Sequence, residues 1–207
     1  MHKPHYWDEA KTHLMKRDRI LRKIIPTFAE EHLKPPSEAF ATLVRAVIGQ
    51  QVSRRNAEAI WERFNNAFEA PATPADVLAL EVAALQQMGM PKRKAEYILD
   101  LALHFEERKV NPESWQDMDD EAIIRELCAI RGIGRWTAEM FLIFNLHRAD
   151  VLPLDDAGLI RAISQHYYSG EPVSRFEARE VAQAWTPWCT VATWYLWRSL
   201  DPIAESE

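Results

Sequence analysis

Two short segments of this sequence carry residues that could do chemistry. Gly132-Ile133-Gly134 lies between two apolar stretches, and the acid pair Asp155-Asp156 follows about twenty residues later. Two glycines so close together allow a tight turn and a close approach of the backbone to an outside group. A fixed carboxylate can stabilise a developing positive charge or orient a water molecule. The spacing indicates a binding turn followed by an acid that acts on what is bound.

The glycine turn is expected to bind an anion. The apolar residues from Trp136 to Leu146 predict a helix directly after the turn, whose first amides and dipole favour negative charge. Because Arg131 and Arg135 flank the turn, phosphate is the anion that we expect. Acids near such a turn are electrostatically costly, which is a reason to expect them to take part in a reaction.

The acid pair precedes the apolar pattern Leu159, Ile160, Ile163, which predicts a helix that one of the two aspartates caps. The residues alone leave two interpretations open. Both acids could be ordinary N-cap residues, or one could be a reactive carboxylate that the positive end of the helix dipole stabilises.

Helical patterns dominate the chain that must position these residues. Apolar residues recur at helical spacing in segments 40–48, 98–105 and 141–144, and strand patterns are nearly missing. Prolines lie between these segments, and Ser37 and Thr73 are expected N-caps. We predict an all-α fold of about ten short helices. Residues 38–146 should form a central lobe with the hairpin, and 1–37 plus 150–207 a second lobe, with an active-site cleft between them.

Composition sets mild limits on the partner. The net charge of −6 argues against nucleic acid, but basic residues cluster at Arg54-Arg55 and Lys92-Arg93-Lys94, while acids concentrate elsewhere, including the tail 201–207. The clusters form either a basic stripe on an acidic body or scattered cations on solvated helix faces.

The chain has no apolar run long enough to span a bilayer, and its first seven residues lack the apolar core of a signal peptide. We therefore expect a cytoplasmic protein, nucleoid-associated in a bacterium. Cys128 and Cys189 are expected to be buried free thiols, and two cysteines are too few for an iron–sulfur cluster. The histidines show no ligand spacing, so no catalytic metal is expected, and His104 and His166 are interpreted as ordinary helix residues.

Three segments together resemble the helix-hairpin-helix (HhH-GPD) DNA glycosylase superfamily, most closely the DNA-3-methyladenine glycosylase II group. The first segment is Val47 to Ser53, and the third is Trp185 to Arg198. The second is the hairpin through Gly132, Gly134, Trp136, Thr137 and Ala138, followed by Asp150, Pro153 and Asp156. They span roughly residues 38–200. A Gly-Ile-Gly hairpin alone is shared by many DNA-binding proteins, whereas the combination is specific. The resemblance implies a monomeric, cofactor-independent enzyme that flips a damaged base out of double-stranded DNA.

The resemblance assigns catalysis to Asp156, which would stabilise the positive charge that develops on the deoxyribose or orient water. Asp155 would cap the helix or form a local hydrogen bond. Members that also cut the DNA strand carry a lysine in the hairpin, where its amine forms a Schiff base. Trp136 stands at the matching position, so we predict a monofunctional glycosylase without lyase activity.

Trp136 and Trp197 match aromatic positions of the family's base pocket; the alternative for each is plain core packing. Aromatic faces attract a cationic alkylated base. Met140 stands where some relatives have tyrosine, which leaves the lesion range open.

Further residues match DNA-contacting positions of the family. Gln51 matches the wedge that fills the space of the flipped base, although it could equally be a polar residue at a helix end, and Ser53 could cap a helix or touch phosphate. A structural Na⁺ or K⁺ at the hairpin is also implied, and Cys189 stands where relatives commonly have arginine. The residues expected to contact the DNA backbone are Gly132, Gly134, Arg135, Thr137, Lys92 and Arg93. The expected cation ligands are the backbone carbonyls of Cys128, Ile130 and Ile133.

Two alternatives remain beside removal of alkylated purines. A glycosylase for deaminated or mismatched bases, such as uracil or hypoxanthine, would need a polar pocket that reads base edges. A non-catalytic helix-hairpin-helix module would bind DNA without cutting any bond, and it would gain nothing from a carboxylate at Asp156 that faces the DNA.

Overall fold

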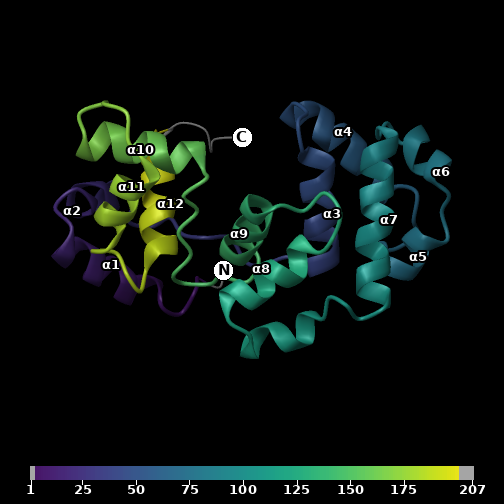
Figure 1. Ribbon diagram of the computed structural model, residues 1–207, viewed down its shortest axis with the longest axis horizontal. Coiled ribbons are helices and arrows are strands. Elements are labelled where there is room, and N and C mark those ends of the chain that lie inside the picture. The colour runs from purple at the N-terminus through teal and green to yellow at the C-terminus, as the bar shows by residue number, and fades with distance from the viewer. Residues whose placement is uncertain (1–2, 201–207) are drawn as a thin grey trace. The chain divides into compact units, whose positions relative to one another are not determined.

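The computed structural model describes residues 3–200, and the acidic tail at 201–207 lies outside the described residues. Within residues 3–200 all regular elements are helices, with no strand, so the predicted all-α fold is confirmed. Twelve α-helices and two 3-10 helices are present in this range, more than the expected ten (Figure 1). The difference comes from short helices such as α2 (Leu21–Ile24), α5 (Pro74–Leu78) and α6 (Val82–Gln87), which are too brief to show a full apolar period.

The chain divides into two compact units, one of residues 37–141 and one of the residues up to 36 together with those from 142 onward. The second boundary falls inside α9 (Arg135–Phe144), whereas the sequence analysis placed it after residue 146. Polar residues such as Asn145 and His147 follow the end of this helix in the sequence. The boundary between the units depends instead on packing within each unit, which these residues do not reveal.

The 37–141 unit is built around α7 (Lys92–Glu106), which packs against α3 (Ala39–Gly49), α5 and α6. It also contains α4 (Arg54–Asn65), the 3-10 helix η2 (Pro112–Asp117) and α8 (Asp120–Cys128). The capping prediction for Ser37 was wrong, because the Glu38 carboxylate accepts hydrogen bonds from the first amides of α3. Thr73 caps α5 as predicted, in a capping box with Asp76.

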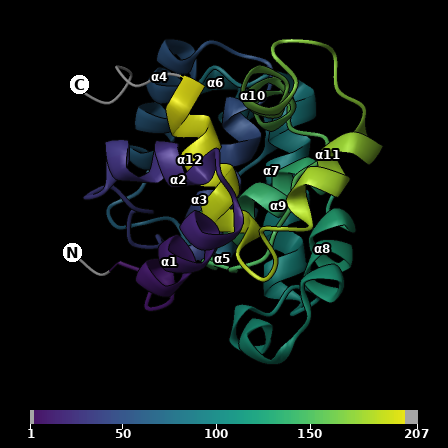
Figure 2. The ribbon, with the colours of Figure 1, turned by 90° about the vertical axis from the view of Figure 1, so that its left-hand side faces the viewer.

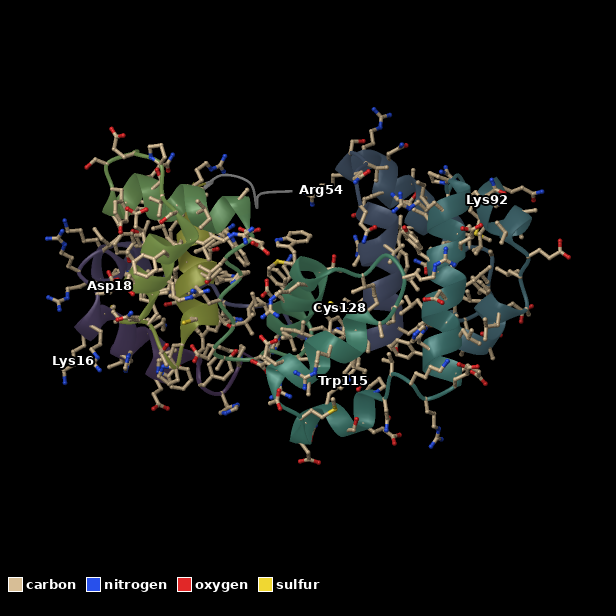
Figure 3. The ribbon with its side chains drawn as sticks, viewed as in Figure 1. Lys16, Asp18, Arg54, Lys92, Trp115 and Cys128 are labelled. Atoms are coloured by element: carbon tan, nitrogen blue, oxygen red, sulfur yellow. The ribbon has the colours of Figure 1, made fainter. Side chains whose placement is uncertain are left out.

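The second unit is built around α12 (Cys189–Leu200), which packs against α1 (Trp7–Arg17), α2 and α10 (Ala157–Tyr167) (Figures 1 and 2). The 3-10 helix η1 (Ile25–Phe28) and α11 (Arg175–Ala182) complete it. Asp18, labelled in Figure 3, is buried here and accepts hydrogen bonds from the Tyr167 hydroxyl and the Trp185 indole. These bonds join three segments that are far apart in the sequence.

The two cysteines differ in burial. Cys189 is buried, as predicted, but Cys128 is exposed, so that prediction was wrong. Cys128 is the last residue of α8, where the chain leaves the buried face of the helix and enters the hairpin. His104 and His166 lie in α7 and α10, as interpreted from the sequence. None of the helices in the described part of the chain is long and apolar enough to cross a membrane.

Candidate active site and hairpin

Asp156 stands at the N-terminus of α10 and is held by two hydrogen bonds. Its Oδ1 accepts from the backbone amide of Leu159 at 2.7 Å and from the indole Nε1 of Trp197 at 2.7 Å. The first bond is an N-cap, and the second comes from α12, forty-one residues further along the chain. Because two donors converge on one oxygen, the plane of the carboxylate is fixed.

The helix cap, one of the two roles expected of Asp155, therefore comes from Asp156. Asp155 is exposed and forms an ion pair with Arg175 at the start of α11, twenty residues away in the sequence. The acid pair is thus divided, with one carboxylate fixed at the helix end and the other engaged on the surface.

Gly158 leaves room for the hydrogen bond between Asp156 and Trp197, and this glycine was not among the predicted site residues. A Cβ atom at this position would lie 3.0 Å from Asp156 Oδ1 and 3.2 Å from Trp197 Cδ1, closer than ordinary van der Waals contact. A glycine inside the first turn of a helix lowers helix stability relative to alanine, so its presence two residues after Asp156 was the available signal.

The segment that leads to Asp156 is fastened to the start of α12. The Asp150 carboxylate accepts from the Cys189 amide at 3.1 Å. The buried Thr190 hydroxyl donates to the Arg148 carbonyl at 2.5 Å and accepts from the Val151 amide at 3.0 Å. The Cys189 side chain itself is buried, and this burial raises the pKa of its thiol. At this position the side chain is therefore part of the packing of α12.

A partly exposed aromatic pair lies beside the acid. Trp197 stacks on Phe144, with ring centroids 5.7 Å apart and an interplanar angle of 16°. Phe144 is 45% exposed although it is large and apolar. Trp136, Met140 and Phe144 are spaced four residues apart on α9 and so share one face of this helix.

Trp136 is 46% exposed, which excludes plain core packing for this residue. Met140 on the same face is half-buried. Phe144 was missed in the sequence analysis, although its helical spacing from Trp136 and Met140 was visible there. The signal was ambiguous because the same spacing also describes a buried helix face.

The hairpin between α8 and α9 depends on its two glycines in different ways. Gly132 has φ +86°, and the ring of Tyr97 lies only 2.1 Å from where a Cβ atom would be. Only glycine satisfies both conditions. A Cβ atom at Gly134 would meet nothing within 4 Å, so the backbone there is open to an outside group. The tight turn and the close approach expected from the sequence are thus divided between the two positions.

The cations around the hairpin are not equivalent. Arg135 forms ion pairs with Glu121 on α8 and with the buried Glu139, four residues along α9. The hydrogen bonds that Arg135 donates to Glu121 raise the pKa of Arg135 and lower the pKa of Glu121. Its charge is therefore largely balanced within the protein. Thr137, the other predicted contact on α9, lies in the first turn of this helix and is half-buried.

Arg93 and Arg131 both lie over the ring of Tyr97, 5.4 and 5.9 Å from its centroid. Lys92, at the start of α7, is exposed and 3.9 Å from a carboxylate oxygen of Glu96 (Figure 3). Glu96 is also 3.8 Å from Arg131, the residue before Gly132, so the three cations lie together beside the hairpin. We call Lys92, Arg93 and Arg131 the basic cluster.

The turn between α3 and α4 presents Gln51. This residue is exposed and has a left-handed backbone, with φ 55°. Ser53 caps α4, its hydroxyl accepting from the Asn56 amide at 3.4 Å. Lys94 belongs to the basic run at residues 92–94 but does not share the exposure of Lys92 and Arg93. Its side chain is buried and donates to the backbone carbonyls at the end of α3, at Ile48 and Gln50.

The chain is similar in sequence and fold to several known DNA glycosylases. DNA-3-methyladenine glycosylase 1 of Schizosaccharomyces pombe is 28% identical over 92% of this chain and 86% of its own length. The crystal structure of a DNA-3-methyladenine glycosidase from Bacillus halodurans is 33% identical, with a TM-score of 0.84 over 96% of this chain and 91% of that one. The S. pombe 3-methyladenine DNA glycosylase in complex with abasic DNA is 27% identical, with a TM-score of 0.79 over 92% of this chain and 96% of that one.

The family model of the HhH-GPD superfamily of base excision DNA repair proteins matches residues 44–187, a span that contains the turn with Gln51, the hairpin and Asp156. The chain therefore belongs to the HhH-GPD superfamily of base excision DNA repair proteins.

Proposed function

We propose that this protein is a monofunctional DNA glycosylase that hydrolyses the bond between an alkylated purine and deoxyribose in duplex DNA, and so initiates base excision repair. The observation that carries the proposal is the Asp156 carboxylate, held by the indole of Trp197, which stacks on the exposed Phe144. The names of the relatives support 3-methyladenine as the type of lesion.

Cleavage of the bond develops positive charge on the sugar. A carboxylate that is already oriented stabilises this charge without reorganising at the moment of reaction. Oδ1 of Asp156 accepts hydrogen bonds from the Leu159 amide and the Trp197 indole, so the acid has little freedom to turn away. A water molecule then attacks the sugar, and the product is an abasic site.

The aromatic pair suits a cationic base. Alkylation at a ring nitrogen makes a purine positively charged and a good leaving group, so the reaction needs no general acid. A desolvated cation over an aromatic face gains about 1–2 kcal/mol. Phe144 and Trp197 supply such faces next to the acid, and Trp136 and Met140 stay predicted pocket residues on the same face of α9 as Phe144.

The base must first leave the duplex. We assign the grip on the DNA backbone to the open amides near Gly134, to Thr137 and to the basic cluster, and the filling of the vacated space to Gln51. Because Arg135 is engaged by two carboxylates, we assign it to the shape of the hairpin rather than to a strong phosphate contact.

A monovalent cation at the hairpin remains part of the proposal. Backbone carbonyl oxygens are hard ligands that suit Na⁺ or K⁺. The Ile130 carbonyl accepts from the Ile133 amide at 3.2 Å, and its second lone pair could face such an ion together with the carbonyls of Cys128 and Ile133. We further propose that the protein acts as a monomer on DNA in the cytoplasm.

The reaction class is tested with duplex DNA that carries methylated purines. We expect free 3-methyladenine by chromatography, and strand breaks on a gel only after alkali treatment, because Trp136 offers no amine for lyase chemistry. If strands break without alkali, the enzyme is bifunctional. Release of uracil or hypoxanthine in place of methylated purines would exclude the proposed substrate class.

A further inference from the structure

The turn at residues 50–53, between α3 and α4, carries the proposed wedge in an unfavourable backbone conformation. Gln51 has φ 55°, a region that residues other than glycine rarely adopt. A left-handed residue on an exposed turn stays in place only if its surroundings hold it. The neighbouring contacts show what does so.

The first contact is Lys94, whose ammonium group reaches the end of α3 from α7. It donates to the Ile48 carbonyl at 2.7 Å and to the Gln50 carbonyl at 2.5 Å. A helix leaves its last carbonyls without partners inside the helix, so these oxygens are natural acceptors. The lysine side chain is only 9% exposed, and burial lowers its pKa, which reflects the cost of removing an ammonium group from water.

The second contact joins the same turn to the hairpin. The side-chain amide of Gln50 donates to the Gly132 carbonyl at 2.8 Å. Gly132 is the residue whose left-handed φ makes the hairpin turn. The residue before the wedge is therefore attached to α7 through its own carbonyl and to the hairpin through its side chain.

We propose that Lys94 and Gln50 are positioning residues that hold the wedge turn in register with the hairpin, so that Gln51 enters the duplex where the hairpin grips its backbone. The inference rests on the proposed base-flipping function, and it assigns to Lys94 a role other than contact with DNA. A buried methionine of similar length would fill the same space without the cost of desolvation but would leave both carbonyls without this donor.

The test compares Lys94→Met and Lys94→Arg with Gln51→Ala and with the double variant Lys94→Met/Gln51→Ala. The matched control is Lys109→Met, which removes an exposed lysine of the same unit that pairs with Glu107. Each protein is mixed with a duplex that carries an alkylated purine opposite 2-aminopurine. The fluorescence of 2-aminopurine reports unstacking, and single-turnover release of the base reports excision.

We expect Lys94→Met to reduce both the fluorescence change and the excision rate by roughly tenfold or more, as Gln51→Ala does, because unassisted flipping must overcome base stacking. The double variant should be no worse than either single variant, since both changes remove the same action. Lys94→Arg should recover most of the signal, and Lys109→Met should behave as wild type.

A wild-type fluorescence change in Lys94→Met would overturn the inference, as would additive losses in the double variant. If Lys94→Met melts below the assay temperature, Gln50→Met gives the same test, because Gln50 is only half-buried; a wild-type signal from Gln50→Met would then refute the role of the turn. If the wild-type protein itself releases no base and gives no signal, the proposed function fails and not merely the role of Lys94.

Discussion

Replacing Trp197 with phenylalanine tests how the acid is held. The change removes the indole N–H that donates to Asp156 Oδ1 at 2.7 Å but keeps an aromatic ring that can stack on Phe144. A hydrogen bond to a charged group contributes about 1.5–3 kcal/mol. Both side chains are partly exposed and the Leu159 amide remains as a donor, so we take the lower end, about 1.5 kcal/mol, which corresponds to a roughly tenfold slower reaction.

The assay is single-turnover release of methylated base at saturating enzyme, which separates the chemical step from binding. Trp188→Phe is the matched control, because Trp188 lies just before α12 in the same unit and stacks on Tyr6. We expect Trp197→Phe to bind product DNA as wild type does while its rate constant falls. A wild-type rate constant would refute the argument that the indole orients the carboxylate, and an equal loss in Trp188→Phe would show that the effect is general destabilisation.

Three further predictions concern the hairpin, the site around Asp156 and the pH dependence of stability. Gly132→Ala should lower the free energy of unfolding by at least about 2 kcal/mol, because a left-handed alanine is strained and its methyl group would meet Tyr97. Gly134→Ala should leave the melting curve unchanged and weaken DNA binding. Equal stability losses in the two variants would contradict this assignment. Gly158→Ala should slow base release with little change in DNA affinity, since its methyl group would push into the acid and indole pair, and undiminished release would count against that crowding. Burial lowers the pKa of His166 below the ordinary value, so its contribution to stability is complete above about pH 6.5 and decreases as the pH falls through the folded-state pKa. The melting temperature of His166→Asn should therefore fall less than that of wild type between pH 7 and pH 5. Equal falls in the two melting temperatures would exclude this residue as a cause.

Local patterns in the sequence were sufficient to predict several elements of the fold. Helical periodicity and proline placement predicted an all-α chain, and the two glycines predicted a turn that Gly132 makes with its positive φ. The helix start after the acid pair was also predictable, because the apolar pattern that begins at Leu159 follows it directly. In each of these cases the cause lies within a few residues of the effect.

Contacts between distant segments were not predictable in this way. Nothing near Trp197 in the sequence shows that its indole reaches Asp156, and nothing near Arg135 shows that Glu121 approaches it from the preceding helix. Lys94 belongs to a run of three cations that look alike in the sequence, yet only this one turns inward to the end of α3. These choices depend on how the helices pack, and periodicity reports only which face of a helix is apolar.

The most direct test of the central claim is Asp156→Asn, because asparagine keeps the size and the hydrogen-bond acceptor of the side chain and removes only its charge. We predict that the variant binds a duplex with an abasic-site analogue as tightly as wild type, and that its single-turnover release of 3-methyladenine falls by roughly a hundredfold or more, the loss of a few kcal/mol of charge stabilisation. Release at the wild-type rate would contradict the account, because the carboxylate would then have no part in the reaction.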